Sequence, residues 1–105
     1  MAWISLLLAG VLEVVWAFSM KRSEGFTRLA PSLVTLVAMI ASFVLLARAM
    51  RELPLGTAYT IWTGIGAVGA FALGVLALGE QLSPIRVAAA GLIVAGLVLM
   101  RVSEG

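Results

Sequence analysis

The sequence predicts an all-α integral membrane protein with four transmembrane helices per subunit. Of its 105 residues, 63% are hydrophobic and 11% are charged, whereas charged residues make up about a quarter of a soluble domain. Apart from Glu13, the charges gather in short clusters between long apolar runs. Four spans of about twenty residues use most of the chain. We therefore expect one transmembrane domain, residues 1–105.

Composition excludes several functional classes. The net charge of +2 is small and scattered, so nucleic acid is not an expected partner. Cysteine and histidine are absent, which removes disulfides, thiolate or imidazole metal sites, and a Cys or His nucleophile or base. Asp and Asn are absent too, so there is no oxygen-rich cage for a hard cation. We expect no metal, no cofactor and no enzymatic activity.

The first helix is expected over residues 2–20, and Lys21 and Arg22 follow it. Its length is about 28 Å, and Glu13 lies about 3 Å from the middle. An acidic residue at that depth costs about 2.5–3.5 kcal/mol. Glu13 is therefore expected to have a partner, a proton or a ligand. The run lacks a basic n-region, so we expect a retained helix and not a signal peptide.

Two neighbours of Glu13 are candidate site residues. Gly10 lies one turn away on the same face, and its small size leaves room for a ligand to approach. Trp16 is either an interfacial anchor or part of a site. Trp3 already stands where an anchor belongs and Trp16 is several residues deeper, which favours the site.

The second helix is expected over residues 29–47. Its few polar residues share one face with Met39, at spacings of three and four: Ser32, Thr35, Met39 and Ser42. Ser42 is the polar residue that lies deepest in the membrane. A membrane serine bonds its own i−4 carbonyl, packs against another helix or contacts a ligand. The residues alone leave these alternatives open.

The third helix is expected over residues 55–78. Tyr59 and Trp62 share a face near its middle, together with Gly66. Core packing is one interpretation of these aromatic side chains. A buried phenol or indole usually needs a hydrogen-bond partner, however, and Glu13 is the carboxylate at that depth. This requirement favours a site that joins the first and third helices.

Glycines in the third helix form the pattern GxGxxG over residues 64–69. A dinucleotide fingerprint follows a strand and opens a soluble helix, and this pattern does neither. The glycines instead permit bending or close helix contact. Gly64 and Gly66 are the candidate hinge.

The fourth helix is expected over residues 85–100. It has no deep polar residue, so no part in binding is expected for it. Small residues let helices approach closely in lipid. The predicted dimer contact consists of Ala88, Ala89, Gly91, Ala95 and Gly96.

Basic residues in the loops give little orientation bias. Four lie on one side of the membrane and three on the other: Lys21, Arg22, Arg28 and Arg86 against Arg48, Arg51 and Arg101. Loop Lys and Arg residues normally fix which side faces the cytoplasm. Insertion in both orientations, and hence an antiparallel dual-topology homodimer that brings two Glu13 residues together, is physically reasonable.

A carboxylate in low dielectric favours its neutral form, and a second copy nearby disfavours double ionisation. Protons and a cation then compete for Glu13, which is the physical basis of antiport. Trp16, Tyr59 and Trp62 offer aromatic surface for an organic cation. A flat guanidinium suits a carboxylate because two parallel N–H bonds form, although residue types alone leave a larger quaternary ammonium open.

The chain resembles the small multidrug resistance family along nearly its whole length. The matching residues are Glu13, then Lys21 with Ser23-Glu-Gly-Phe-Thr-Arg28-Leu, then Gly56-Thr-Ala-Tyr59-Thr-Ile-Trp62-Thr-Gly-Ile-Gly66. The resemblance implies four helices per subunit, an antiparallel dual-topology dimer, and proton-coupled cation export that uses the glutamates in turn. It also implies a multi-pass protein of the bacterial inner membrane.

Within that family the chain is similar to the guanidinium-exporter branch, on the strength of Trp16 and Met39. The resemblance implies that Glu13 binds protons and guanidinium-type cations. It also implies a surrounding shell of Trp16, Ser42, Tyr59 and Trp62, to which we add Gly10. A departure from the family pattern lies in the fourth helix, where Ala89 pairs with Gly96 in place of two glycines.

Three alternatives remain open. The nearest is a broader quaternary-ammonium or multidrug cation exporter with the same machinery. Another is a non-transporting membrane subunit that pairs Glu13 with a basic residue of a partner. An ion channel is a third, but one glutamate among aromatic neighbours is a poor lining for a water-filled pore.

Overall fold

A computed structural model describes residues 1–103, which form four helices, each long and apolar enough to cross a membrane. Helix α1 covers Ala2–Arg22 and α2 covers Leu29–Ala49. Helix α3 covers Leu55–Leu78 and α4 covers Pro84–Ser103. The polar segments of the sequence therefore become the turns, and the apolar runs become the helices.

Three helices extend beyond the ranges expected from the sequence. Helix α1 ends two residues later than expected, at Arg22, and has basic residues in its last turn. Their positive charges interact favourably with the negative end of the helix dipole and stabilise this turn. Helix α2 ends at Ala49 and α4 at Ser103. In α4, Arg101 lies between apolar residues in the sequence, and the helix continues past this single charged residue to Ser103. At 20 residues, α4 is longer than expected.

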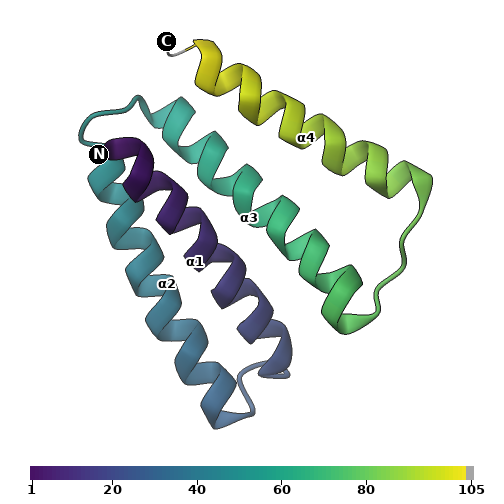
Figure 1. The fold of residues 1–105 in the computed structure, drawn as a ribbon. Helices are drawn as coiled ribbons and strands as arrows, with labels where there is room; N and C mark the ends of the chain where they lie inside the picture. The colour runs from purple at the N-terminus through teal and green to yellow at the C-terminus, as the bar shows by residue number, and fades with distance from the viewer. Residues whose placement is uncertain (104–105) are drawn as a thin grey trace.

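The helices lie in the order α2, α1, α3, α4 across the molecule, with α1 between α2 and α3 and with α4 beside α3 (Figure 1). The molecule measures 42 × 34 × 16 Å along its principal axes. A helix with its side chains is about 10–12 Å wide. The protomer is therefore a thin slab, and both of its broad faces are open.

Small residues set the close packing of α1 against its neighbours. Ala9 is fully buried and belongs to the apolar core. A Cβ atom on Gly10 would lie 2.7 Å from Ile65 Cγ2, and one on Gly69 would overlap Val14. Without a large apolar driving force in lipid, such close backbone approach is what holds helices together.

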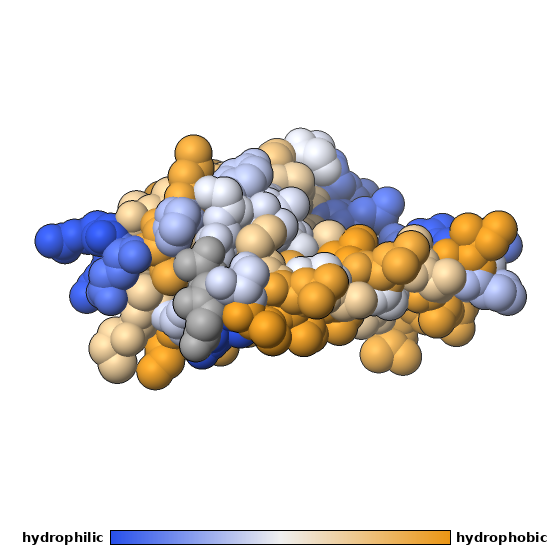
Figure 2. All heavy atoms as spheres, turned by 90° about the horizontal axis from the view of Figure 1, so that it is seen from above, coloured by the Kyte–Doolittle hydropathy of each residue, from blue (hydrophilic) through white to orange (hydrophobic). Residues whose placement is uncertain are grey.

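Large apolar side chains cover the outside of the slab. Val37, Ile40 and Leu76 are among many that are more than half exposed. Figure 2 shows apolar surface across much of one face, with hydrophilic residues gathered mainly toward its two ends. A surface of this kind is stable against hydrocarbon and unstable against water.

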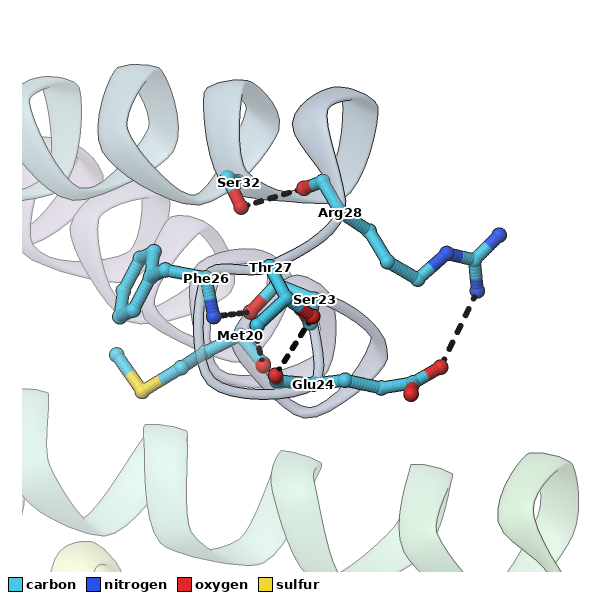
Figure 3. Close-up of polar contacts among 7 residues, drawn as sticks. All are labelled: Met20, Ser23, Glu24, Phe26, Thr27, Arg28 and Ser32. Carbon is cyan, nitrogen blue, oxygen red and sulfur yellow. Dashed lines mark hydrogen bonds and ion pairs between the residues drawn. The ribbon is translucent and has the colours of Figure 1, made fainter.

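Ser23 organises the turn between α1 and α2 (Figure 3). Its buried hydroxyl donates to the Met20 carbonyl at 2.6 Å and accepts from the Phe26 N–H at 3.0 Å. These bonds hold three successive residues at positive φ: Glu24 at 51°, Gly25 at 75° and Phe26 at 67°. Left-handed backbone is costly for Glu and Phe, so the serine stabilises a turn that glycine alone would not explain.

The turn between α3 and α4 uses a glycine and a serine. Gly79 ends α3 in the left-handed conformation at φ 69°, which glycine adopts readily, and the Glu80 N–H donates to the Gly74 carbonyl at 2.9 Å. Ser83 Oγ then accepts from the Arg86 N–H at 3.2 Å, with Pro84 as the first residue of α4.

Candidate functional site

Glu13 lies in the contact between α1 and α3. Its carboxyl group occupies space beside Gly66 that a Cβ atom on that residue would overlap. The side chain is half-buried as a whole, but Oε1 is buried and has no hydrogen-bond partner among residues 1–103. The glycine therefore makes room for the carboxylate without satisfying it.

Trp16 presents a second unsatisfied polar atom on the same helix. Its indole Nε1 is buried and has no hydrogen-bond partner within the described part of the chain. Buried polar atoms are nearly always paired, so each exception needs an explanation. Here an acceptor and a donor, three residues apart on α1, are both left available for a ligand, a proton, water or another chain.

Ser42 joins three helices. Its hydroxyl donates to the Ala9 carbonyl on α1 at 2.7 Å and accepts from Trp62 Nε1 on α3 at 3.0 Å. Thr35, about two turns earlier on the same stripe of α2, instead donates to the i−4 carbonyl of Pro31 at 2.8 Å. Of the alternatives that the sequence left open, the i−4 bond is thus found at Thr35 and contact with other helices at Ser42.

The acceptor for Trp62 differs from the one that the sequence suggested. Residue types alone favour Glu13 as the acceptor for the polar aromatic side chains of α3, but Trp62 donates to Ser42. The reason is that Ser42 is fully buried on α2 directly opposite, and a shared bond satisfies the serine oxygen and the indole together.

An aromatic row crosses three helices. Trp16 and Phe43 lie 6.3 Å apart at an angle of 71°, and Phe43 and Trp62 lie 5.8 Å apart at 56°. Trp62 also contacts Tyr59, at 5.6 Å and 47°. Tyr59 is 52% exposed, so it stands at the open end of the row. The spacings are those of favourable edge and tilted aromatic pairs.

Phe43 was missed by the sequence reasoning. No role is expected for it from the sequence, yet it connects Trp16 to Trp62. A signal was available, because Phe43 is the one aromatic residue of that apolar stretch and directly follows Ser42.

Gly10 does not leave open space beside Glu13. The side chain of Ile65, on α3, fills the position that a Cβ atom on Gly10 would take. The expectation of room for a ligand at this point is therefore wrong for the protomer. The reason is that α1 and α3 use Gly10 to approach each other closely.

The two candidate hinge glycines lie inside an uninterrupted helix. Gly64 gives room to Leu97 of α4, and Gly66 gives room to Glu13. In this conformation, both act as close-contact positions, which is one of the two alternatives that the sequence allowed. Bending at these residues stays a prediction.

The predicted dimer residues of α4 lie at the surface of the protomer, where Gly96 shares a cavity lining with Tyr59. All five are exposed: Ala88, Ala89, Gly91, Ala95 and Gly96. Over Pro84–Ser103, α4 buries none of its residues in the protomer. A metal-binding cluster of three His, Cys, Asp or Glu side chains is absent from the described residues.

Comparison with known proteins gives matches along the chain. A family profile described as "Small Multidrug Resistance protein" matches residues 1–93. Proteins named "Guanidinium exporter" from Citrobacter freundii and Salmonella typhimurium are each 58% identical over 103 residues, which cover 98% of this chain and 98% of the relative. One of the same name from Yersinia pseudotuberculosis is 56% identical over 104 residues, or 99% of this chain and 100% of the relative.

Proposed function

We infer a transport function for this chain because it belongs to the small multidrug resistance family, whose profile covers residues 1–93. With its four apolar helices in residues 1–103, it is a multi-pass membrane protein. Its relatives at 56–58% identity are named guanidinium exporters. We propose that this chain exports guanidinium and small substituted guanidinium cations across the bacterial inner membrane.

The observation that carries the proposal is the unsatisfied Glu13 Oε1 in the contact between α1 and α3. A carboxylate can accept two parallel N–H bonds from a planar guanidinium. A buried anion without a partner is costly, so the group favours either a bound cation or a bound proton. Glu13 is therefore proposed as the site that protons and substrate occupy in turn.

The groups around Glu13 support a positioning role. Ser42 ties α1, α2 and α3 together and fixes the Trp62 indole. The row from Trp16 through Phe43 to Trp62 supplies aromatic faces next to that hydrogen-bonded core. Aromatic faces attract organic cations by about 0.5–2 kcal/mol. We propose that Trp16, Ser42 and Trp62 orient the substrate, with Tyr59 at the open end.

A complete site requires more than this slab. The protomer is 16 Å thick along its shortest axis, and the exposed small face of α4 has no cover within residues 1–103. The buried Trp16 N–H also lacks an acceptor there, which a carboxylate of a second copy would supply. We therefore propose an antiparallel homodimer in which two Glu13 residues share one central site.

Coupling follows from competition in this proposed dimer. A proton that neutralises Glu13 releases the guanidinium, and a guanidinium that binds displaces the proton. If the dimer changes its open side when loaded or protonated, but not when both carboxylates are bare, inward proton movement drives outward cation movement. This is proton-coupled antiport by alternating access.

The test is transport in liposomes with an imposed pH gradient. We expect the parent protein to accumulate guanidinium against its concentration gradient, and Glu13→Gln to lose this activity. Glu52→Gln is the matched control, because it makes the same change at an exposed turn residue outside the site. Uphill transport by Glu13→Gln would contradict the proposal.

Substrate choice needs a separate measurement. Guanidinium and a bulky aromatic quaternary ammonium should compete for the same protein, with guanidinium the stronger competitor. Tighter binding of the bulky cation would assign the protein to the broader multidrug alternative. A stable complex with another protein, together with no flux from the purified chain, would instead support a non-transporting subunit.

A further inference from the structure

A cavity lies at the end of the slab where α1 ends, α3 ends and α4 begins. Its volume is about 310 Å³, and its lining includes Lys21, Glu80 and Arg86. Phe18 and Phe71 form part of its apolar wall. Because the charged residues stand at helix ends and in a turn, the charged end of the cavity lies at the depth of the lipid headgroups.

Positive charge dominates this cavity. Within residues 1–103, neither Lys21 nor Arg86 forms an ion pair; the pair that is present joins Arg28 to Glu24, at 3.8 Å. Glu80 supplies a negative charge, and its carboxylate packs against Gly74. Two unpaired cations against one carboxylate leave the lining with a net positive charge.

Aromatic rings hold two guanidinium groups at this depth. The Arg86 guanidinium lies 5.6 Å from the centre of the Phe71 ring, and the Arg22 guanidinium lies 5.8 Å from that of Phe18. Both rings line the cavity. Cation–π contact restrains an arginine without neutralising it. Of the cations that line the cavity, Arg86 is therefore positioned by a ring but still available to an anion.

An apolar groove continues from this cavity between α3 and α4. It measures about 220 Å³ and shares Ala67, Phe71 and Arg86 with the lining of the first cavity. Its remaining wall is apolar, including Val68 and Ile93. A positively charged pocket at headgroup depth that opens into an apolar groove is suited to a molecule with an anionic head and a hydrocarbon tail.

We propose that this cavity binds the headgroup of an anionic glycerophospholipid such as phosphatidylglycerol. Lys21 and Arg86 contact the phosphate, and one acyl chain follows the groove between α3 and α4. Basic pockets between membrane helices recognise lipid headgroups in this way. Glu80 accepts from a headgroup hydroxyl and disfavours a lipid with additional negative charge. None of the residues proposed to contact guanidinium lines this cavity, so lipid retention and guanidinium transport can be tested separately.

The test is native mass spectrometry of the purified full-length protein in mild detergent. Phosphatidylglycerol, phosphatidylcholine and phosphatidylethanolamine with identical acyl chains are added in turn, and the retained lipid is counted. We expect preferential retention of phosphatidylglycerol by the parent protein. Equal or stronger retention of phosphatidylcholine or phosphatidylethanolamine would overturn the proposal. Stronger retention of phosphatidylethanolamine would indicate that its ammonium group pairs with Glu80.

Charge variants locate the site. Lys21→Gln and Arg86→Gln should each weaken phosphatidylglycerol retention about fivefold, the contribution of one basic residue at the membrane surface. Arg28→Gln is the matched control, since it removes one positive charge on the same side of the membrane but outside the cavity. An equal loss in Arg28→Gln would show a diffuse charge effect and overturn the assignment.

Two further experiments distinguish a specific lipid site from a loss of folding and from binding of any free anion. Lys21→Arg keeps the charge and should restore retention, which a variant that fails to fold would not do. Inorganic phosphate added in millimolar excess should leave the lipid in place, because it lacks an acyl chain for the groove. Displacement of phosphatidylglycerol by phosphate, or loss of retention in Lys21→Arg, would contradict the proposal.

Discussion

The Glu13 carboxyl group on α1 lies against Gly66 on α3, in space that any side chain at residue 66 would need. This contact places the buried acid of α1 at a glycine in the middle of α3. In this conformation Gly66 leaves space for the carboxyl group, and α3 continues through it without a break.

Gly66→Ala should displace the carboxylate and weaken guanidinium transport. A misplacement of about 1 Å in a preorganised site costs on the order of tenfold to a hundredfold, and we expect a loss in that range in the liposome assay. Gly56→Ala is the control, because a Cβ atom there meets nothing within 4 Å. Unchanged transport in Gly66→Ala would show that the contact has no functional role.

Ser42→Ala should destabilise the protein. The change removes the acceptor of the buried Trp62 N–H and the donor to the Ala9 carbonyl. Leaving a buried group unsatisfied costs about 1–3 kcal/mol, which thermal unfolding in detergent would detect as a lower Tm. Ser32→Ala is the control: the exposed Ser32 hydroxyl bonds to the Arg28 carbonyl just before α2, and its loss should change stability by less than about 0.5 kcal/mol.

Guanidinium affinity should fall as the pH falls. If Glu13 holds the cation as proposed, its protonation removes the negative charge that attracts the cation, so binding should release protons and the apparent Kd should rise at low pH. The slope is at most about tenfold per pH unit for each proton displaced. Calorimetric titration over a pH series measures it. Affinity that stays constant across the series would exclude competition at a shared carboxylate.

Ala95→Leu should weaken the proposed dimer. Its added bulk projects from the exposed small face of α4, where close backbone approach to a second copy would be blocked. Light scattering in detergent should show a larger monomer fraction. Ala72→Leu makes the same change at an exposed position of α3 and should leave the fraction unchanged. Equal dimer fractions in the two variants would place the contact elsewhere.

Much of the fold could be predicted because lipid imposes simple rules. Four apolar runs of membrane length, separated by charged turns, predict the helices within a few residues at each end. Helices α1 and α4 continue past their expected ends, to Arg22 and Ser103, because basic side chains are favourable in the last turn of a helix and do not terminate it.

The site was predicted less completely than the helices. The depth of Glu13 follows from its position in one apolar run, but its contact with Gly66 depends on how α1 and α3 pack. Likewise, Ser42 and Ala9 are separated by 33 residues, so residue types could not choose between a bond within α2 and one across helices. Phe43 was overlooked because a phenylalanine has no polar atom to mark it.

The turn at Ser23 shows another limit. Gly25 explained a break in the helix, but positive φ at Glu24 and Phe26 is not expected from residue preference. The conformation depends on the hydroxyl of Ser23, which bonds on both sides of the turn. A local polar network of this kind becomes visible only in three dimensions.

The position of α4 has a mechanical consequence. Within residues 1–103 its backbone packs against α3, and the Ser42 network that ties α1, α2 and α3 includes none of its residues. The boundary between α3 and α4 is thus a natural shear plane, along which packed helices slide by repacking side chains. Tilting of α1, α2 and α3 together as one rigid body against α4 would leave every bond of that network unbroken.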